Sequence, residues 1–483
     1  MHTENLELVN CNVYSVRQEK HTIQDIYISG GQIVDSRPVQ ARTIDMGGAC
    51  VYCGFVDSHA HLLGTGMIKG SADLSGIRSL EDLEKALKSS VPVLVARGWD
   101  DDKLSFIPNR AMIDRITQKP AILYRRCGHV AVVNSAAIER FSLTDLDEMD
   151  GSSLKTGLLK ERALNSLSNR IELTKTELEA FVELGIQEFI SNGITSVHSD
   201  DMGSFNDTLL IDVIRSQRSL RVFEKVKMET EDDIELFELV RESSNSFFTA
   251  GAIKIYLDGS LGARTAALLE PYSDDPMNCG MLYMDTEQLE SIVEIAEKKS
   301  IQVCAHTIGD RSMEVALKGF RRTAPGNPLK HRLIHVQTAN PDQLDNMRKL
   351  GLRASIQPLF FFSDSDIVEK RLGEARLPHT YPYAEMENKG IRFALSSDSP
   401  VESVSIFRNL SAADRFFDRT NSIRYYTVEG KDLEGNSRYG ELGPGNAADL
   451  IAVSVDLVEA DSRTLNDAEV LMTIVAGRIV FSR

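Results

Sequence analysis

The sequence predicts an α/β protein with three parts: a (β/α)8 TIM barrel, a small discontinuous β-sandwich domain from both chain ends, and an insertion after the first barrel strand. Helical patterns alternate with short apolar strands through the middle of the chain, both ends are rich in strands and turns, and residues 65–170 carry strand-like runs of their own. The predicted boundaries are 1–52 plus 440–483 for the β-sandwich domain, 53–439 for the barrel and 65–170 for the insertion.

The β-rich ends support the discontinuous domain. "LELVNCNVYS" alternates apolar and polar residues, "DIYISGGQIVDS" places a Gly-Gly turn between two extended runs, and "EVLMTIVAGRIVFSR" near the C-terminus has the same texture. Two β-rich ends that flank one long middle are expected to pair with each other.

Helix signals in the middle of the chain define the βα units. Thr174 and Glu177 have the spacing of a capping box, and Gly193 suits a left-handed helix stop before the strand "ITSVHS". Pro341 suits a first helical turn, and Gly351 suits the end of that helix. Eight strands can be counted in this part: "GFVDSHAHL", "ITSVHS", "RVFEKVKM", "AIKIYLDG", "IQVCAHTI", "RLIHVQ", "LRASIQP" and "IRFALSSDSP".

Composition limits the classes of partner. The chain has 483 residues with 54 Lys and Arg against 71 Asp and Glu, a net charge of −17, which argues against nucleic acid or an anionic membrane as the main partner. No apolar run approaches the roughly 18–20 residues of a membrane span, and "MHTENLELVN" lacks the layout of a signal peptide. We therefore expect a cytoplasmic protein with a small-molecule substrate, and a homo-oligomer is left open.

The six cysteines are too few for a disulfide scaffold. Cys50 and Cys53 form one C-x-x-C pair, "CVYC", without a second pair or a helix start beside it. We interpret this pair as structural.

Polar residues follow the predicted barrel strands at their C-terminal ends, where active sites of such barrels lie. Residues i and i+2 of a strand share a face, so Asp57, His59 and His61 are expected to point into the barrel together. The converging set is His59, His61, Lys254, His306, His335 and Asp398. Each alone would more often be structural. Burying all of them costs several kcal/mol per unpaired charge, and a metal ion offsets that cost because imidazole nitrogens and carboxylate oxygens are zinc ligands.

With these residues, the sequence resembles the amidohydrolase superfamily. The features are "VDSHAH" after a β-module, histidines on strands five and six, and an aspartate on strand eight. Further stretches resemble the YtcJ-like subgroup, which includes N-substituted formamide deformylases: "RGWDDDKL", "RRCGHVAVVNSAAI", "TGLLKERAL", "GITSVHS", "KIYLDGSLGARTAAL", "AHTIGDRS" and "SSDSPV".

The resemblance implies a divalent metal, zinc being expected, with one or two ions per chain. It implies that His59 and His61 bind one ion beside Asp398, and that His306 and His335 bind the other. Lys254 matches the position at which such enzymes often carry a carboxylated lysine that bridges two metals.

The expected reaction is hydrolysis of a carbon–nitrogen bond, amide or N-formyl/N-acyl, by metal-activated hydroxide, with Asp398 moving the proton. Deamination of a ring amine is the alternative, and a catalytically inactive binding or regulatory relative is a weaker one because the full ligand set is present. A nicotinamide oxidoreductase lacks its glycine fingerprint here.

Four further residues are candidates for substrate binding. Trp99 and His129 lie in the insertion. For each, a role in lining the substrate cleft and a purely structural packing role are given equal weight. His198 ends the second predicted barrel strand, which suits a contact to substrate or to a ligand. Arg264 suits an anionic substrate group, although a structural salt bridge is slightly favoured.

Overall fold

The computed structural model describes residues 4–88, 91–100, 104, 106–125, 130–149, 152–168, 170–202, 207–435 and 440–483. The chain divides into two compact units. The first comprises Met1–Leu62, Phe189–Gly203 and Ile214–Arg483, and the second comprises Leu63–Glu188 and Ser204–Val213. Within the described ranges, no helix combines the length and the apolar content that crossing a bilayer requires.

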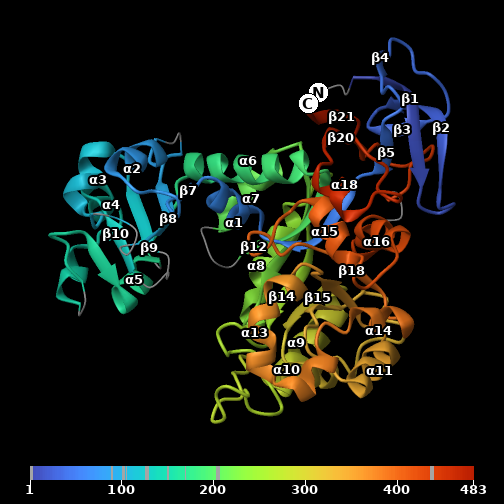
Figure 1. Cartoon of the computed structure of the whole chain (residues 1–483). Helices are drawn as coiled ribbons and strands as arrows, with labels where there is room; N and C mark the ends of the chain where they lie inside the picture. The colour runs from blue at the N-terminus through green and yellow to red at the C-terminus, as the bar shows by residue number, and fades with distance from the viewer. Residues whose placement is uncertain are drawn as a thin grey trace. The chain divides into compact units, whose positions relative to one another are not determined.

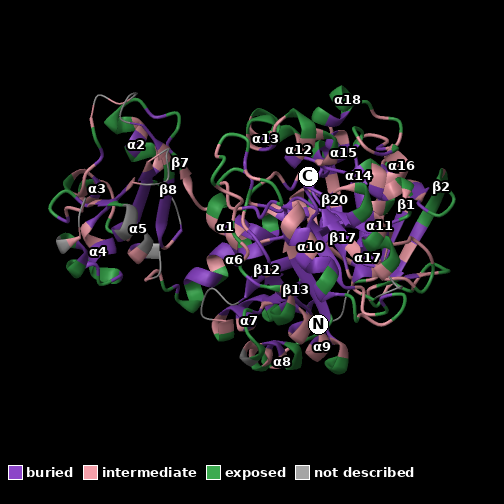
Figure 2. Ribbon diagram, turned by 90° about the horizontal axis from the view of Figure 1, so that it is seen from below, coloured by how far each residue is buried: buried purple, intermediate pink, exposed green. Residues whose placement is uncertain are grey.

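Eight parallel strands form a nearly closed barrel in the first unit (Figure 1). They are the eight strands expected from the sequence, and they follow one another around the barrel in chain order, so the predicted parallel barrel is confirmed. The strands that Figure 2 labels in this sheet are largely buried. The barrel strands are β6 (Phe55–Ala60), β12 (Ile194–Met202), β13 (Arg221–Lys227), β14 (Phe248–Tyr256), β15 (Gln302–Thr307), β16 (Arg332–His335), β17 (Arg353–Ile356) and β18 (Phe393–Leu395).

Backbone hydrogen bonds join the two ends of this sheet. The Asp398 N–H, shortly after β18, donates to the His59 carbonyl at 2.8 Å, and the His61 N–H donates to the Ser399 carbonyl at 2.8 Å. The C-terminal ends of the first and last strands therefore lie side by side.

Helices alternate with the strands, and their ends follow the expected sequence signals. The side chains of Thr174 and Glu177 form the predicted reciprocal cap, and Pro341 begins a helix that Gly351 ends at φ +67°. Helices α9 and α10 pack against β15, and α11 packs against α10 (Figure 1). The helices after residue 174 are α6 (Lys175–Ser191), α7 (Asp207–Ser216), α8 (Ile234–Glu242), α9 (Thr286–Lys299), α10 (Asp310–Gly319), α11 (Pro341–Leu350), α12 (Phe360–Ser363), α13 (Ser365–Leu372), α14 (Tyr383–Asn388), α15 (Ile406–Ala413), α16 (Arg419–Tyr426), α17 (Val428–Leu433) and α18 (Ser462–Asn466).

Both chain ends contribute to a second sheet of the first unit, drawn in blue and red in Figure 1. N-terminal strand β5 pairs antiparallel with C-terminal strand β19, and Leu8, Ile28, Val51 and Leu450 belong to the buried core between these parts. Hydrogen bonds join all eight strands into one sheet, and the two-layer sandwich stays a prediction. The strands are β1 (Leu6–Ser15), β2 (Lys20–Ser29), β3 (Gln32–Val34), β4 (Arg42–Asp45), β5 (Cys50–Cys53), β19 (Leu450–Val453), β20 (Val470–Val475) and β21 (Arg478–Ser482).

The second unit has a five-stranded mixed sheet of its own. The strand-like runs at 91–99 and 121–133 supply three of its strands, and the unit extends to Glu188, beyond the insertion expected at 65–170. Its strands are β7 (Ala72–Asp73), β8 (Leu94–Trp99), β9 (Ala121–Arg125), β10 (Val130–Val133) and β11 (Leu158–Lys160). The helices before α6 are α1 (Leu62–Lys69), α2 (Leu80–Ala86), α3 (Arg110–Ile116), α4 (Ser135–Arg140) and α5 (Glu161–Ser168).

The second sheet of the first unit, to which both chain ends contribute, is called the terminal sheet below. A buried ion pair joins it to the barrel. The guanidinium of Arg221 on β13 donates to both carboxylate oxygens of Asp449, at 2.6 and 3.1 Å, and the two side chains are only 10% and 5% exposed. Asp449 also accepts from the Ala476 N–H at 2.7 Å, and its carbonyl accepts from the Gly54 N–H at 2.9 Å. One aspartate therefore holds a barrel strand and three segments of the terminal sheet region together.

Replacing Asp449 by alanine should destabilise the first unit by about 3–5 kcal/mol, because the Arg221 guanidinium would be left buried without its partner. Differential scanning calorimetry is expected to show a lower Tm for Asp449→Ala. The control is Lys318→Ala, which removes an exposed pair with Glu314 and should leave the Tm nearly unchanged. Equal Tm values for Asp449→Ala and Lys318→Ala would contradict this role for Asp449.

Candidate functional site

The barrel brings the six predicted metal-site residues to the C-terminal ends of its strands. His59 lies on β6 and His61 directly follows it, Lys254 lies on β14, His306 on β15 and His335 ends β16. The sixth, Asp398, follows β18, and all six belong to the first unit. Parallel strands end at one rim of a barrel, which is why residues so far apart in the sequence meet there.

Two of the histidines and the aspartate form the tightest group. The Nε2 atoms of His59 and His61 lie 3.2 and 3.4 Å from the same oxygen, Oδ1 of Asp398. One ligand atom from each of the three residues lies within 4.8 Å of the others. Their side chains therefore present two imidazole nitrogens and one carboxylate oxygen to a common point.

The other two histidines adjoin this group. The ring centroids of His59 and His335 are 5.4 Å apart, and those of His335 and His306 are 4.7 Å apart. The four imidazoles therefore form a continuous row, with Asp398 beside its first two members.

Hydrogen bonds orient three of these rings in the same way. Nδ1 of His61 donates to the Asp200 carbonyl at 2.8 Å, and Nδ1 of His335 donates to Oε1 of Gln357 at 2.8 Å. Nδ1 of His306 donates to Oδ1 of Asp258 at 3.0 Å. A proton fixed on Nδ1 leaves the lone pair of the neutral ring on Nε2, as is usual for histidines that bind metals.

One buried polar atom in particular fits a cation. Oδ1 of Asp398 has no hydrogen-bond partner among the described residues, and it faces Nε2 of His59 and of His61. A buried carboxylate oxygen without a hydrogen bond is costly, and a divalent ion between it and the imidazole nitrogens would satisfy it. Nitrogen and oxygen donors of this kind suit zinc and related ions.

Electrostatics keep most of these groups in the state that binds a metal. Burial lowers the pKa of His335 to about 3 and lowers that of His59, so both rings are neutral at pH 7. Burial opposes ionisation of Asp398, but His61, His335 and Lys254 together bring its pKa below the ordinary value. For His61, burial is outweighed by Asp398, Asp200 and Asp201, and its pKa rises to about 9.

Lys254 is completely buried and pairs with a carboxylate. Its ammonium contacts Oδ2 of Asp200, which also accepts from the Tyr256 hydroxyl at 2.8 Å. Burial raises the pKa of Asp200, but the charges of Lys254 and its neighbours bring the net pKa below the ordinary value. An anionic carbamate on Lys254 would repel Asp200 unless cations stood between them.

The backbone is strained at two of these positions. His335 has φ +78° and Asp398 has φ +58°, in the left-handed region that non-glycine residues rarely adopt. Such conformations cost of order 1–3 kcal/mol and occur where surrounding contacts enforce them. At Asp398 the enforcing contacts include the bond to the His59 carbonyl and the hydrogen bonds from the Ser397 N–H and hydroxyl to the Asp57 carboxylate, at 3.1 and 2.5 Å.

A cavity of about 260 Å³ opens onto the row of imidazoles. His306, His335 and Asp398 line one part of it. Apolar and polar side chains line the rest, among them Leu261, Ile308, Phe360, Val401, Gln337 and Asp364. The volume is slightly below the usual range of about 300–1,000 Å³ for small-molecule sites, so it suits a small substrate.

The two candidate substrate contacts in the second unit are Trp99 and His129. Trp99 is buried in its own sheet, where its Nε1–H donates to the Leu123 carbonyl at 2.9 Å. His129 lies outside the described residues.

His198 and Arg264 are both held by carboxylates. Nε2 of His198 lies 3.1 Å from Oε1 of Glu434, its Nδ1 accepts from Arg332 at 2.9 Å, and burial lowers its pKa to about 3. Arg264 donates to both oxygens of Asp274, at 3.1 and 2.9 Å, which is the structural salt bridge favoured from the sequence.

Sequence reasoning missed the three residues that orient the histidines: Asp200, Asp258 and Gln357. Asp258 and Gln357 follow barrel strands, and Asp200 lies near the C-terminal end of β12, on the same rim as the ligands. The strand-end rule that selected the histidines would therefore have selected these residues too.

Comparison with known proteins agrees with this geometry. The model of the amidohydrolase family matches residues 42–481. Two relatives are "Putative amidohydrolase YtcJ" of Bacillus subtilis (strain 168), 25% identical over 98% of each chain, and N-substituted formamide deformylase of Arthrobacter pascens, 22% identical over 99% of this chain and 98% of that protein. An uncharacterized metal-dependent hydrolase from Pyrococcus horikoshii OT3 superimposes with a TM-score of 0.80 at 28% identity, covering 95% of this chain and 99% of that chain. The resemblance found in the sequence is confirmed, and the chain belongs to the amidohydrolase family.

Proposed function

We propose that the protein is a metal-dependent hydrolase that cleaves a carbon–nitrogen bond of an amide, N-formyl or N-acyl group. The observation that carries the proposal is the convergence of His59, His61 and Asp398, with His335 and His306 adjoining, beside a cavity of small-molecule size. The relationship to N-substituted formamide deformylase supports this bond class.

The ligands follow from the orientation of the rings. His59, His61 and Asp398 would hold one divalent cation, zinc being preferred, and His306 and His335 would hold a second. Lys254, as a carbamate, would be a further ligand, and the charge of the cations would offset its repulsion from Asp200. When bound, the metal makes a water molecule more acidic and polarises the carbonyl oxygen of the substrate.

Asp398 is the residue that moves the proton. Its carboxylate lines the cavity and is ionised, so it can accept a proton from the attacking water. The same carboxyl group then returns the proton to the leaving nitrogen, which must depart as a neutral amine. The left-handed backbone at Asp398 and its hydrogen bond to His59 hold the carboxylate against the cavity during both transfers.

The test of the bond class is a substrate panel with the zinc-loaded protein. N-formyl and N-acyl derivatives of small amines are expected to be hydrolysed to the amine and a carboxylate, detected by chromatography. Ring amines such as aminopurines are assayed alongside for ammonia release. Ammonia release with no N-acyl hydrolysis would replace the proposal by a deaminase, and a metal-loaded protein inactive on both sets would contradict it.

Replacing Asp398 by asparagine should lower kcat by about 10²- to 10⁴-fold, because an amide cannot accept and return the proton. His59, His61, His306 and His335 are expected to retain metal, which elemental analysis would measure. The matched control is Asp274→Asn, which changes an aspartate paired with Arg264 outside the metal site and should leave kcat unchanged. Near-normal turnover in Asp398→Asn would reject this residue as the base.

Metal affinity should increase with pH up to about 9. In the metal-free protein the pKa of His61 is about 9, so below that pH the cation must displace a proton from the ring. Displacing one proton makes the apparent affinity rise about tenfold per pH unit, until the ring is neutral. Competition with a chromophoric chelator at pH 7, 8 and 9 measures this slope. The slope should fall in His61→Gln, and a pH-independent affinity in the wild type would contradict the assignment.

A further inference from the structure

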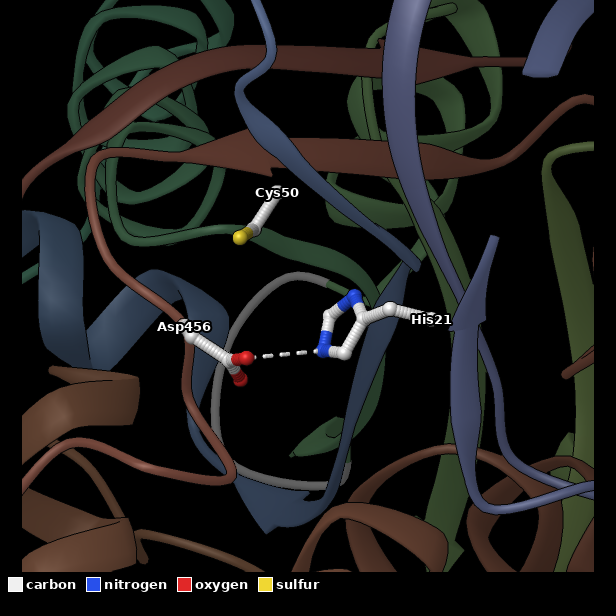
Figure 3. A group of neighbouring side chains, drawn as sticks. All are labelled: His21, Cys50 and Asp456. Atoms are coloured by element: carbon white, nitrogen blue, oxygen red, sulfur yellow. Dashed lines mark ion pairs between the residues drawn. The ribbon is translucent and has the colours of Figure 1, made fainter. Parts of the chain in front are cut away.

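A second group of metal-binding side chains lies outside the barrel, in the terminal sheet. Figure 3 shows His21, Cys50 and Asp456 approaching one another from three segments of the chain. His21 is on β2, Cys50 is on β5, and Asp456 follows β19. The group therefore combines residues from both ends of the chain within the first unit.

The distances within this group suit a small cation. Nε2 of His21 lies 3.1 Å from Oδ2 of Asp456, and one ligand atom from each of the three residues lies within 4.8 Å of the others. A tetrahedral zinc ion about 2.0–2.3 Å from each ligand holds those atoms roughly 3.3–3.7 Å apart. The three side chains would need to move together by only about an ångström.

Asp456 is fixed in place by other contacts. Its Oδ1 accepts from the Tyr52 hydroxyl at 3.0 Å and from the Val458 N–H at 2.9 Å, so Oδ2 is left to face His21. Burial alone would raise the pKa of Asp456, but these hydrogen bonds and His21 lower it, so the carboxylate is charged. An ionised oxygen held in a fixed direction is a suitable metal ligand.

A hydrogen-bonded His–Asp–Tyr network is the competing explanation, and it leaves the Cys50 thiol unused. Among the described residues, the Cys50 sulfur accepts only a 3.4 Å contact from the Asn12 amide, although it lies beside the other two ligands. A thiol adds nothing to a His–Asp–Tyr network, whereas it completes a nitrogen–sulfur–oxygen ligand set.

The site is accessible to ions from solvent. The side chains of His21 and Asp456 are 21% and 29% exposed, so a cation and a water molecule as fourth ligand can enter. The Tyr52 hydroxyl, 3.5 Å from Nε2 of His21, is near enough to contact that water. Cys53, three residues along β5, points to the other face of the strand, so the C-x-x-C pair does not act together.

We propose that His21, Cys50 and Asp456 form a second cation site that binds Zn²⁺ or a similar borderline-soft ion and cross-links both chain ends in the terminal sheet. A ligand set of imidazole, thiolate and carboxylate favours such ions over Mg²⁺ or Ca²⁺, which prefer oxygen. As the metal–sulfur bond forms, the Cys50 thiol releases its proton to solvent. The site is independent of the chemistry proposed for the barrel.

The experiment uses Co²⁺ as the probe, because a Co²⁺–thiolate bond has a sulfur-to-metal charge-transfer band in the near ultraviolet and the proposed barrel ligands include no thiolate. The metal-free full-length protein is titrated with Co²⁺. The wild type should develop this band with a saturable amplitude, and Cys50→Ser should lose it. The visible absorption of Co²⁺ in the barrel should persist in that variant.

The matched control is Cys304→Ser, because Cys304 lies on β15, the barrel strand that carries His306. The band should survive in this variant. Absence of the band in the wild type, its survival in Cys50→Ser, or its loss in Cys304→Ser would each overturn the proposal.

A second variant keeps the test valid if Cys50→Ser fails to fold. His21→Gln changes a partly exposed residue on β2 and should weaken Co²⁺ binding, read from the same band, at least tenfold. Elemental analysis of the zinc-loaded proteins should then give about one ion fewer per chain in His21→Gln than in the wild type. Equal zinc content and an unchanged Co²⁺ titration would overturn the proposal, and the hydrogen-bonded His–Asp–Tyr network would then explain the group.

Discussion

The closure of the barrel is the constraint on which the rest of the site depends. Two backbone hydrogen bonds, from Asp398 to the His59 carbonyl and from His61 to the Ser399 carbonyl, join the ends of the first and last strands. They place a carboxylate from the end of the barrel 3.2 and 3.4 Å from two imidazoles at its beginning. The group is therefore a consequence of ring closure, since an open sheet would leave these residues at opposite edges.

Hydrogen bonds from Nδ1 fix the orientation of three histidine rings at this site. A carbonyl, an amide oxygen and a carboxylate accept from Nδ1 of His61, His335 and His306. Each acceptor comes from a different strand end, so the rim supplies both the ligands and the groups that orient them. With the proton held on Nδ1, Nε2 is the nitrogen of each ring that is left for a metal ion.

The sequence predicted the eight strands and the ring of histidines because both depend on local periodicity. Alternation within "VDSHAH" placed His59 and His61 on one face, and the strand-end rule added His306 and His335. The rule selected His198 as a rim residue instead of Asp200, because it expected the strand to end at residue 199. In the structure β12 continues to Met202. His198 therefore lies below the rim, against Glu434, and Asp200 occupies the rim position. The strand-end rule marks Gln357 as a rim residue, but the ring that it orients depends on side-chain rotamers and on neighbouring strands, which no local pattern contains.

The order of the strands in the terminal sheet bears on how the chain folds. β5 lies between β1 and β19, and a single residue, Gly54, separates it from β6, the strand that carries His59. During synthesis, the edge of β5 that pairs with β19 stays uncovered until β19, roughly four hundred residues later, has been made. Until then an unpaired strand edge lies directly beside the first ligands of the barrel, and exposed edges of this kind invite misassociation. The segment that carries the first ligands is therefore open to misassociation until β19, which begins at Leu450 in this chain of 483 residues, has emerged.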